Sequence, residues 1–131
     1  MIGLDTNVLV RYFGQDDAQQ SPQADAIFDS LTADAPGWVG LAAILELVWV
    51  MISVKGANRV VVADTLDQLL AMEAMAVEQA STVADAVRRF RSGKAEFADC
   101  LIAASAQTAG CGRTLTFDRI AARDAGMELI L

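Results

Sequence analysis

Short apolar runs and longer amphipathic stretches alternate along the chain, and this alternation predicts strands and helices in turn. Strands are expected where a few apolar residues stand between turn residues. Helices are expected where apolar residues recur at helical spacing, as at Ala24, Ile27 and Leu31 before the break at Pro36-Gly37. The predicted strands cover residues 1–5, 37–40, 73–78, 113–117 and 127–131, and the predicted helices cover residues 6–13, 21–34, 40–54, 58–72, 81–91, 96–109 and 118–125.

Strands that alternate with helices indicate a parallel sheet, because parallel neighbours need crossover connections and helices supply them. We therefore predict the α/β class and an α/β/α sandwich with a parallel sheet of four to five strands. The chain of 131 residues has no repeat or linker and fits one domain spanning 1–131. In open sheets of this kind the ligand site lies beyond the carboxyl ends of the strands.

One predicted helix, residues 40–54, is almost wholly apolar and carries a single charge, Glu46. Its fifteen residues fall short of the roughly 20 that a membrane span needs, so we interpret it as a core helix of a protein that does not enter the membrane. Burying a carboxylate without a partner costs roughly several kcal/mol of free energy. Glu46 is therefore expected to have a raised pKa or a bound cation.

Four acids stand where parallel strands end or where the following helices begin. Asp5 and Asp118 close predicted strands, whereas Glu46 and Asp99 lie in the opening turns of helices. All four can reach one edge of the sheet, where they would repel one another unless a divalent cation were bound. Oxygen ligands without histidine or cysteine suit Mg²⁺ or Mn²⁺. Such a site predicts attack of metal-activated water on a phosphodiester.

Each acid also has a simpler explanation. Asp5 and Asp118 can cap the helices that follow them, and Asp99 can belong to the exposed face of its helix. Four further residues are candidates for supporting the metal or the phosphate, and all four can equally serve as turn or helix-end residues. They are Thr6, Asn7, Glu96 and Thr116.

The formal net charge is −7, which by itself argues against nucleic-acid binding, because affinity for phosphate normally depends on a basic surface. The charge is nevertheless uneven along the chain. Arg88, Arg89, Arg91 and Lys94 lie within seven residues immediately before the Asp99 helix. They form a candidate nucleic-acid-binding rim, with a solvated helix face as the alternative interpretation.

Two cysteines, Cys100 and Cys111, form no CxxC pair, and the chain has no histidine to complete a zinc site. We interpret Cys100 as a small buried apolar residue. The first residues contain an acid and lack the basic segment and cleavage site of a signal peptide. These features predict a reduced, cytoplasmic setting.

Four segments together resemble the PIN-domain ribonucleases, and most closely the VapC toxins of bacterial toxin–antitoxin pairs. The segments are IGLDTNVLVRYF, ILELVWVM, EFADCLIAASAQTAGC and TLTFDRIAARDAGMELI, and their order and spacing span nearly the whole chain. The resemblance implies that Asp5, Glu46, Asp99 and Asp118 are an acidic quartet that holds Mg²⁺ or Mn²⁺ for endonucleolytic cleavage of RNA. It also implies a homodimer and a cognate antitoxin whose tail occupies the active-site groove.

Two other functions are compatible with an acid after the first strand. A phosphatase of the haloacid-dehalogenase type needs a second aspartate where this chain has Asn7, and its phosphate-binding lysine would have to be Lys55 or Lys94. A non-catalytic PIN-fold interaction module would need none of the four acids. Cleavage of RNA would indicate the nuclease, and hydrolysis of a small phosphate ester would indicate the phosphatase. Absence of both activities would indicate the non-catalytic module.

Overall fold

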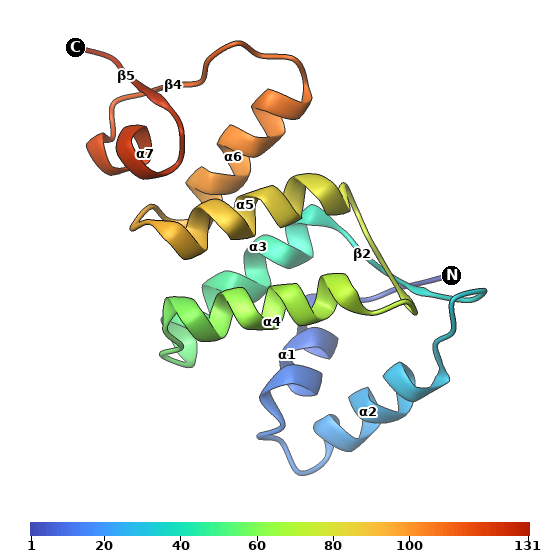
Figure 1. Ribbon diagram of the computed structural model, residues 1–131. Coiled ribbons are helices and arrows are strands. Elements are labelled where there is room, and N and C mark those ends of the chain that lie inside the picture. The colour runs from blue at the N-terminus through green and yellow to red at the C-terminus, as the bar shows by residue number, and fades with distance from the viewer. The chain divides into compact units, whose positions relative to one another are not determined.

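The computed structural model describes all 131 residues, and its helices and strands are drawn in Figure 1. The residues divide into two compact units. Unit 1 comprises Met1–Asn58 and Gln68–Glu78, and unit 2 comprises Arg59–Asp67 and Gln79–Leu131. Helix α4 (Arg59–Ala71) contributes its first nine residues to unit 2 and the remainder to unit 1.

Unit 1 is built on a parallel sheet with the strand order β1-β2-β3. Gly37 occupies the centre of this sheet, opposite Ile2 and Met75, and a Cβ atom there would lie 2.9 Å from Cδ1 of Leu31. Helix α1 packs against α2 and α3, and Leu9 and Ile44 are fully buried. The elements are β1 (Ile2–Gly3), α1 (Thr6–Gly14), α2 (Gln20–Ser30), β2 (Gly37–Val39), α3 (Leu41–Trp49), the π-helix η1 (Val50–Val54) and β3 (Met75–Val77).

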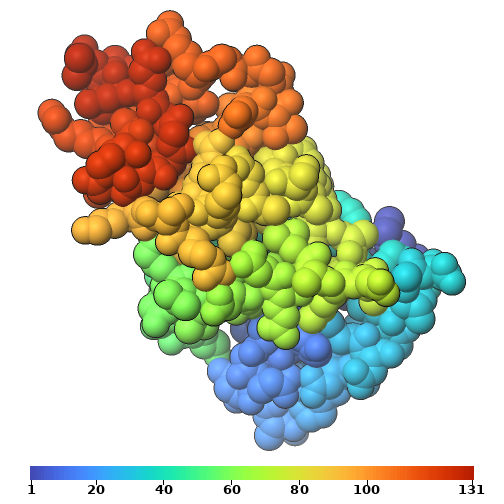
Figure 2. All heavy atoms as spheres, viewed as in Figure 1, coloured from blue at the N-terminus to red at the C-terminus, as the bar shows by residue number.

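Unit 2 is organised around helices α5 and α6, which pack along one another. Their contact includes an edge-to-face pair of Phe90 and Phe97, with ring centroids 5.7 Å apart. The space-filling view shows the red C-terminal segment lying on the yellow and orange atoms of these helices (Figure 2). The elements are α5 (Ala80–Ser92), α6 (Phe97–Thr108), β4 (Leu115–Thr116), α7 (Arg119–Asp124) and β5 (Glu128–Leu129), and β4 pairs in parallel with β5.

Every strand and helix predicted from the sequence is present, and the α/β class with parallel pairing is confirmed. The prediction of one sheet with four to five strands is wrong, because β4 and β5 form a separate two-stranded sheet. Each strand has only two or three residues, so it forms few ladder hydrogen bonds. Each pairs only with the strand before or after it along the chain, to which one crossover connects it. The α/β/α layering stays a prediction.

The apolar run at residues 40–54 forms α3 followed by η1. The π-helix η1 ends at Lys55, whose N–H donates to the carbonyl oxygen of Val50 at 3.0 Å. Short π-helical turns of this kind interrupt α-helices and alter which side chains share a face. No helix in the structure combines the length and the apolar character needed to cross a membrane.

Candidate functional site

Asp5 stands two residues after β1, at the carboxyl end of the unit 1 sheet. It is the N-cap of α1, and its Oδ1 accepts a hydrogen bond from the N–H of Thr6 at 2.8 Å. The simpler explanation of Asp5 as a cap is therefore confirmed. The cap uses only one carboxylate oxygen, so Oδ2 remains available as a ligand.

Thr6 connects Asp5 to the second acid of unit 1. Its side chain is buried, and its Oγ1 donates to Oε1 of Glu46 at 3.1 Å, across forty residues of sequence. Thr6 therefore binds Asp5 through its backbone and Glu46 through its side chain. This residue therefore links the two carboxylates within unit 1.

The expectation that Glu46 is buried is wrong, because its side chain is exposed on α3. Successive residues on a helix are about 100° apart, so the apolar neighbours of Glu46 in the sequence do not surround it in space. Ala43, Ile44, Leu47 and Val48 face the core, whereas Leu45 and Glu46 face outward. Glu46 is therefore accessible to a ligand without the desolvation cost of a buried charge.

Asp118 follows β4 in unit 2 and is the N-cap of α7. Its Oδ1 accepts from the N–H of Ala121 at 2.8 Å, and its own N–H donates to Oγ1 of Thr116 at 3.0 Å. Thr116 thereby fixes the backbone that carries the acid. As with Asp5, the second carboxylate oxygen is not used by the cap.

Asp99 lies in the first turn of α6, where it is half-buried and has no hydrogen bond or ion pair. Glu96 precedes it as the N-cap residue of the same helix and makes no side-chain cap. The two carboxylates are three residues apart and share one helical face. Both are free to bind a ligand.

The structure divides the four candidate acids equally between the units, with Asp5 and Glu46 in unit 1 and Asp99 and Asp118 in unit 2. Within neither unit do three or more acids or cysteines gather closely enough to hold a metal ion. The joint quartet therefore stays a prediction. Asn7 is exposed and lines a cavity of about 210 Å³ between α1 and α2, together with Arg11 and Gln20.

The candidate basic rim is largely engaged in ion pairs within unit 2. Arg88 and Arg89 share Asp85, and Arg89 also donates to the carbonyl oxygen of Ala125 at 2.8 Å. Arg91 donates to two further carboxylates, those of Asp64 and Asp67, and these hydrogen bonds raise its pKa. The side chain of Lys94 is exposed and unpaired.

Formal charge is distributed unequally between the two units. Unit 1 contains two basic and nine acidic residues and carries the whole net charge of −7. Unit 2 contains eight basic and eight acidic residues and is neutral. A polyanion is therefore repelled less by unit 2 than by unit 1.

Two residues that the sequence did not single out hold the turn between α5 and α6. Arg59 donates to the carbonyl oxygens of Phe90 and Ala95 at 2.6 and 2.7 Å. Asp124 accepts from the N–H of Lys94 at 2.8 Å and from Arg123. Both contacts lie directly before the helix that carries Asp99. No local pattern marks either residue, because each acts on residues about 30 positions away in the sequence.

Replacing Asp124 with alanine is expected to lower the melting temperature at pH 7. Hydrogen bonds from Arg123 and from the N–H of Lys94 lower the pKa of Asp124 to about 2, from an ordinary value of 3.8. A lowered folded-state pKa means that the stabilisation is complete above pH 3.8 and is lost as the pH falls toward about 2. The melting temperatures of the wild type and of Asp124→Ala should therefore differ at pH 7 and converge near pH 2. A difference in melting temperature that is the same at both pH values would contradict this role.

The donor set fits a hard divalent cation. Each candidate ligand is a carboxylate, at least one oxygen of Asp5, Glu46 and Asp118 is outside the observed hydrogen bonds, and Asp99 is wholly free. Mg²⁺ and Mn²⁺ bind through one or a few carboxylates and keep waters for the substrate. Cys100 is poorly suited as a soft ligand, since it is fully buried and its burial raises the pKa of the thiol.

In a comparison with known protein families, residues 2–126 match the model of the PIN domain. No curated protein and no solved structure matches the chain.

Proposed function

Because the chain belongs to the PIN-domain family, whose members are generally nucleases that use divalent metal ions, we propose that it is a metal-dependent endoribonuclease and the toxin of a VapC-type toxin–antitoxin pair. The contact of Thr6 with both Asp5 and Glu46 is the observation that carries the proposal. A buried threonine that joins two carboxylates from separate helices holds them in a fixed geometry, which a metal site requires.

In this proposal Asp5, Glu46, Asp99 and Asp118 hold Mg²⁺ or Mn²⁺, and the ion supplies a lowered pKa for a bound water and neutralises charge on the phosphodiester. Thr6 orients the first two carboxylates. Thr116 fixes the backbone at Asp118, while the first turn of α6 presents Asp99. Glu96 and Asn7 lie beside these groups in sequence and support the ion or the phosphate.

The test is cleavage of RNA by the purified chain with Mn²⁺ or Mg²⁺. We expect endonucleolytic products with either ion and intact RNA in EDTA. Hydrolysis of a small phosphate ester without RNA cleavage would favour the phosphatase alternative. Absence of both activities would favour the non-catalytic module.

A basic antitoxin segment fits the acidic character of unit 1. The nine acids of this unit face only two basic residues, Arg11 and Lys55, and both of these pair with Asp16. An antitoxin side chain such as arginine would meet a negative field around Asp5 and Glu46, where it would compete with the metal ion. We propose such a segment as the cognate inhibitor.

The proposed homodimer has a candidate interface on α3 and η1. Leu45, Trp49 and Ile52 are 37%, 63% and 42% exposed, and their spacing places them along one stripe. A continuous apolar stripe that includes a tryptophan is typical of a subunit interface, and a second copy of the chain supplies an equally apolar surface. We propose that two chains meet along this stripe.

Replacing Trp49 with glutamate is expected to convert a dimer into a monomer, because it would bury a charge at the centre of the interface. Light scattering after size-exclusion chromatography measures this change as a halved mass. Trp49→Phe retains an apolar ring and should preserve the dimer. Equal masses for the glutamate variant and the wild type would exclude this interface.

A further inference from the structure

Unit 2 contains a cavity of about 370 Å³ beside the C-terminal half of α6, whereas Asp99 lies in the first turn of that helix. Cavities of this size hold small organic molecules. None of the four candidate acids lines it. Its walls come from α5, from α6 and from two loops, residues 111–114 and 124–126, and its charged and polar side chains are Arg88, Arg89, Gln107, Arg113, Thr114 and Asp124. We call it the arginine cavity.

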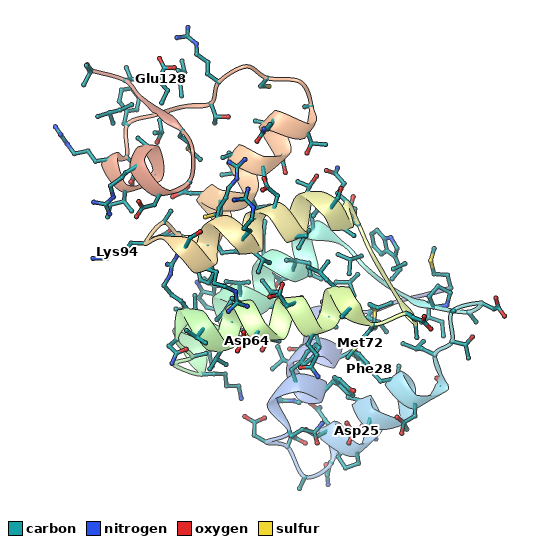
Figure 3. The ribbon with its side chains drawn as sticks, in the orientation of Figure 1. Asp25, Phe28, Asp64, Met72, Lys94 and Glu128 are labelled. Carbon is teal, nitrogen blue, oxygen red and sulfur yellow. The ribbon has the colours of Figure 1, made fainter.

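Three arginines line the cavity, and the acids that pair with them leave positive charge uncompensated. Arg88 and Arg89 share the single carboxylate of Asp85, and Arg89 is held in place there because its side chain is only 14% exposed. Arg113 pairs with Glu128 of β5, which is labelled in Figure 3, and its charge is thereby balanced. One positive charge therefore remains at this wall, in a chain whose net charge is −7. Such a wall attracts an anion.

Asp124 is the only acid in the lining, and its own partners balance its charge. Its two carboxylate oxygens accept hydrogen bonds from Arg123 at 2.9 and 3.0 Å. One of them also accepts from the N–H of Lys94 at 2.8 Å. Asp124 therefore does not cancel the positive charge that the arginines supply to the cavity.

Hydrogen-bond donors remain unused at this wall. Arg88 and Arg113 are 70% and 67% exposed, and each donates to an acid through one nitrogen, Nη2 of Arg88 and Nη1 of Arg113. A guanidinium group has five N–H donors, so most of them are free. The backbone N–H groups of Gly112 and Arg113 donate no hydrogen bond to the rest of the chain. The cavity therefore offers donors in excess of the acceptors that surround it.

We propose that the arginine cavity binds a small phosphate ester, whose phosphate group accepts hydrogen bonds from Arg88, from Arg113 and from the N–H groups of the loop at residues 112–113. Planar guanidinium groups match the oxygens of a phosphate in pairs. A phosphate ion alone would leave most of the volume empty, so the remainder accommodates the organic part of the ester beside Ala103 and Gln107. A hollow of this size favours a ligand that enters whole over an RNA strand. The inference does not depend on the proposed nuclease function.

Isothermal titration calorimetry with ribose 5-phosphate, adenosine 5′-monophosphate and inorganic phosphate tests the cavity. Both esters should bind more tightly than inorganic phosphate, and ribose without phosphate should not bind. Arg88→Gln and Arg113→Gln should each weaken binding of the esters roughly 10- to 100-fold, since each removes a charged donor to the phosphate. Arg119→Gln is the matched control, because Arg119 is an exposed cation of α7 outside the cavity, and it should retain the affinity.

Labelling of Cys111 with iodoacetamide locates the bound ester. Cys111 lines the cavity and is exposed, whereas Cys100 is fully buried. Saturating ribose 5-phosphate should slow the labelling, and Arg88→Gln should remove this protection at the same concentration of the ester. Cys111→Ser should abolish the rapid labelling and retain the affinity for the ester.

Four results would overturn the proposal. They are absence of binding by both esters, equal affinities in Arg119→Gln and the two cavity variants, binding that leaves the labelling rate unchanged, and inorganic phosphate that binds as tightly as the esters. An RNA strand that needs Arg88 and Arg113 while no small ester binds would replace the ester with a phosphodiester and likewise overturn it. No measurement uses RNA cleavage. Failure of the cavity therefore leaves the nuclease proposal standing, and intact RNA with Mn²⁺ leaves the cavity standing.

Discussion

Replacing Asp99 with asparagine is expected to reduce metal-dependent RNA cleavage roughly 100- to 1,000-fold, because a bound ion supplies several kcal/mol of transition-state stabilisation in hydrolases of this type. Asp99 is half-buried and has no partner in unit 2, so its replacement breaks no observed hydrogen bond. The substitution preserves the shape of the side chain and removes one negative charge. Activity should therefore fall while the fold persists.

The measurement is the initial rate of RNA cleavage at saturating Mn²⁺, accompanied by thermal melts with and without the ion. Asp5→Asn should lose activity similarly. The wild type should gain more stability from Mn²⁺ than either variant, since a ligand stabilises the folded state according to its affinity. Asp29→Asn is the matched control, because Asp29 is an exposed acid of α2 outside the proposed quartet. Full activity of Asp99→Asn, or activity of the wild type in EDTA, would refute the proposed site.

Features set by local sequence were predicted well. Each strand and helix was found because its boundaries are written nearby, as with Pro36-Gly37 before β2. Capping by Asp5 and Asp118 was recognised as one use of these residues, and the structure confirms it. Caps depend on residues within three positions, so a single sequence contains the information.

Features set by distant residues were predicted less well. The number of strands in each sheet depends on pairing across the chain, and the sequence alone did not show that β4 and β5 pair only with each other. Exposure of Glu46 depends on which face of α3 meets the core, and its neighbours in the sequence did not reveal it. Four basic residues looked alike in the segment RRFRSGK, but Arg91 pairs with the distant acids Asp64 and Asp67. Arg88 and Arg89 pair with Asp85 on their own helix, so only Lys94 is left without a partner.

Arg59 shows how such a distant contact can matter for the candidate site. Its guanidinium group donates to two carbonyl oxygens of the α5–α6 segment and lies 3.9 Å from the ring centroid of Phe90. One nitrogen, Nε, is buried without a partner, which offsets part of the gain. The residue therefore ties the start of α4 to the turn that precedes the Asp99 helix.

Replacing Arg59 with methionine is expected to lower the free energy of unfolding by about 3 kcal/mol. The variant retains the apolar stem but leaves the carbonyl oxygens of Phe90 and Ala95 without their charged donor, and each such hydrogen bond contributes roughly 1.5–3 kcal/mol. Urea denaturation measures the loss, and hydrogen exchange should show faster opening of residues 92–96 than of α2. Because the turn positions Asp99, the Mn²⁺-induced stabilisation should fall as well.

Arg113→Met is the control for this prediction, since Arg113 pairs with Glu128 at 3.1 Å on an exposed surface. Loss of an exposed pair should cost less than about 1 kcal/mol. Arg59→Lys retains the charge but has a single nitrogen in place of the planar group, so its stability should lie between those of the wild type and Arg59→Met. If Arg59→Met and Arg113→Met lost equal stability, the two carbonyl contacts would contribute no more than a surface ion pair. The start of α6 would then be fixed by Asp124 and by packing of Phe90 on Phe97, which remain in the Arg59 variant.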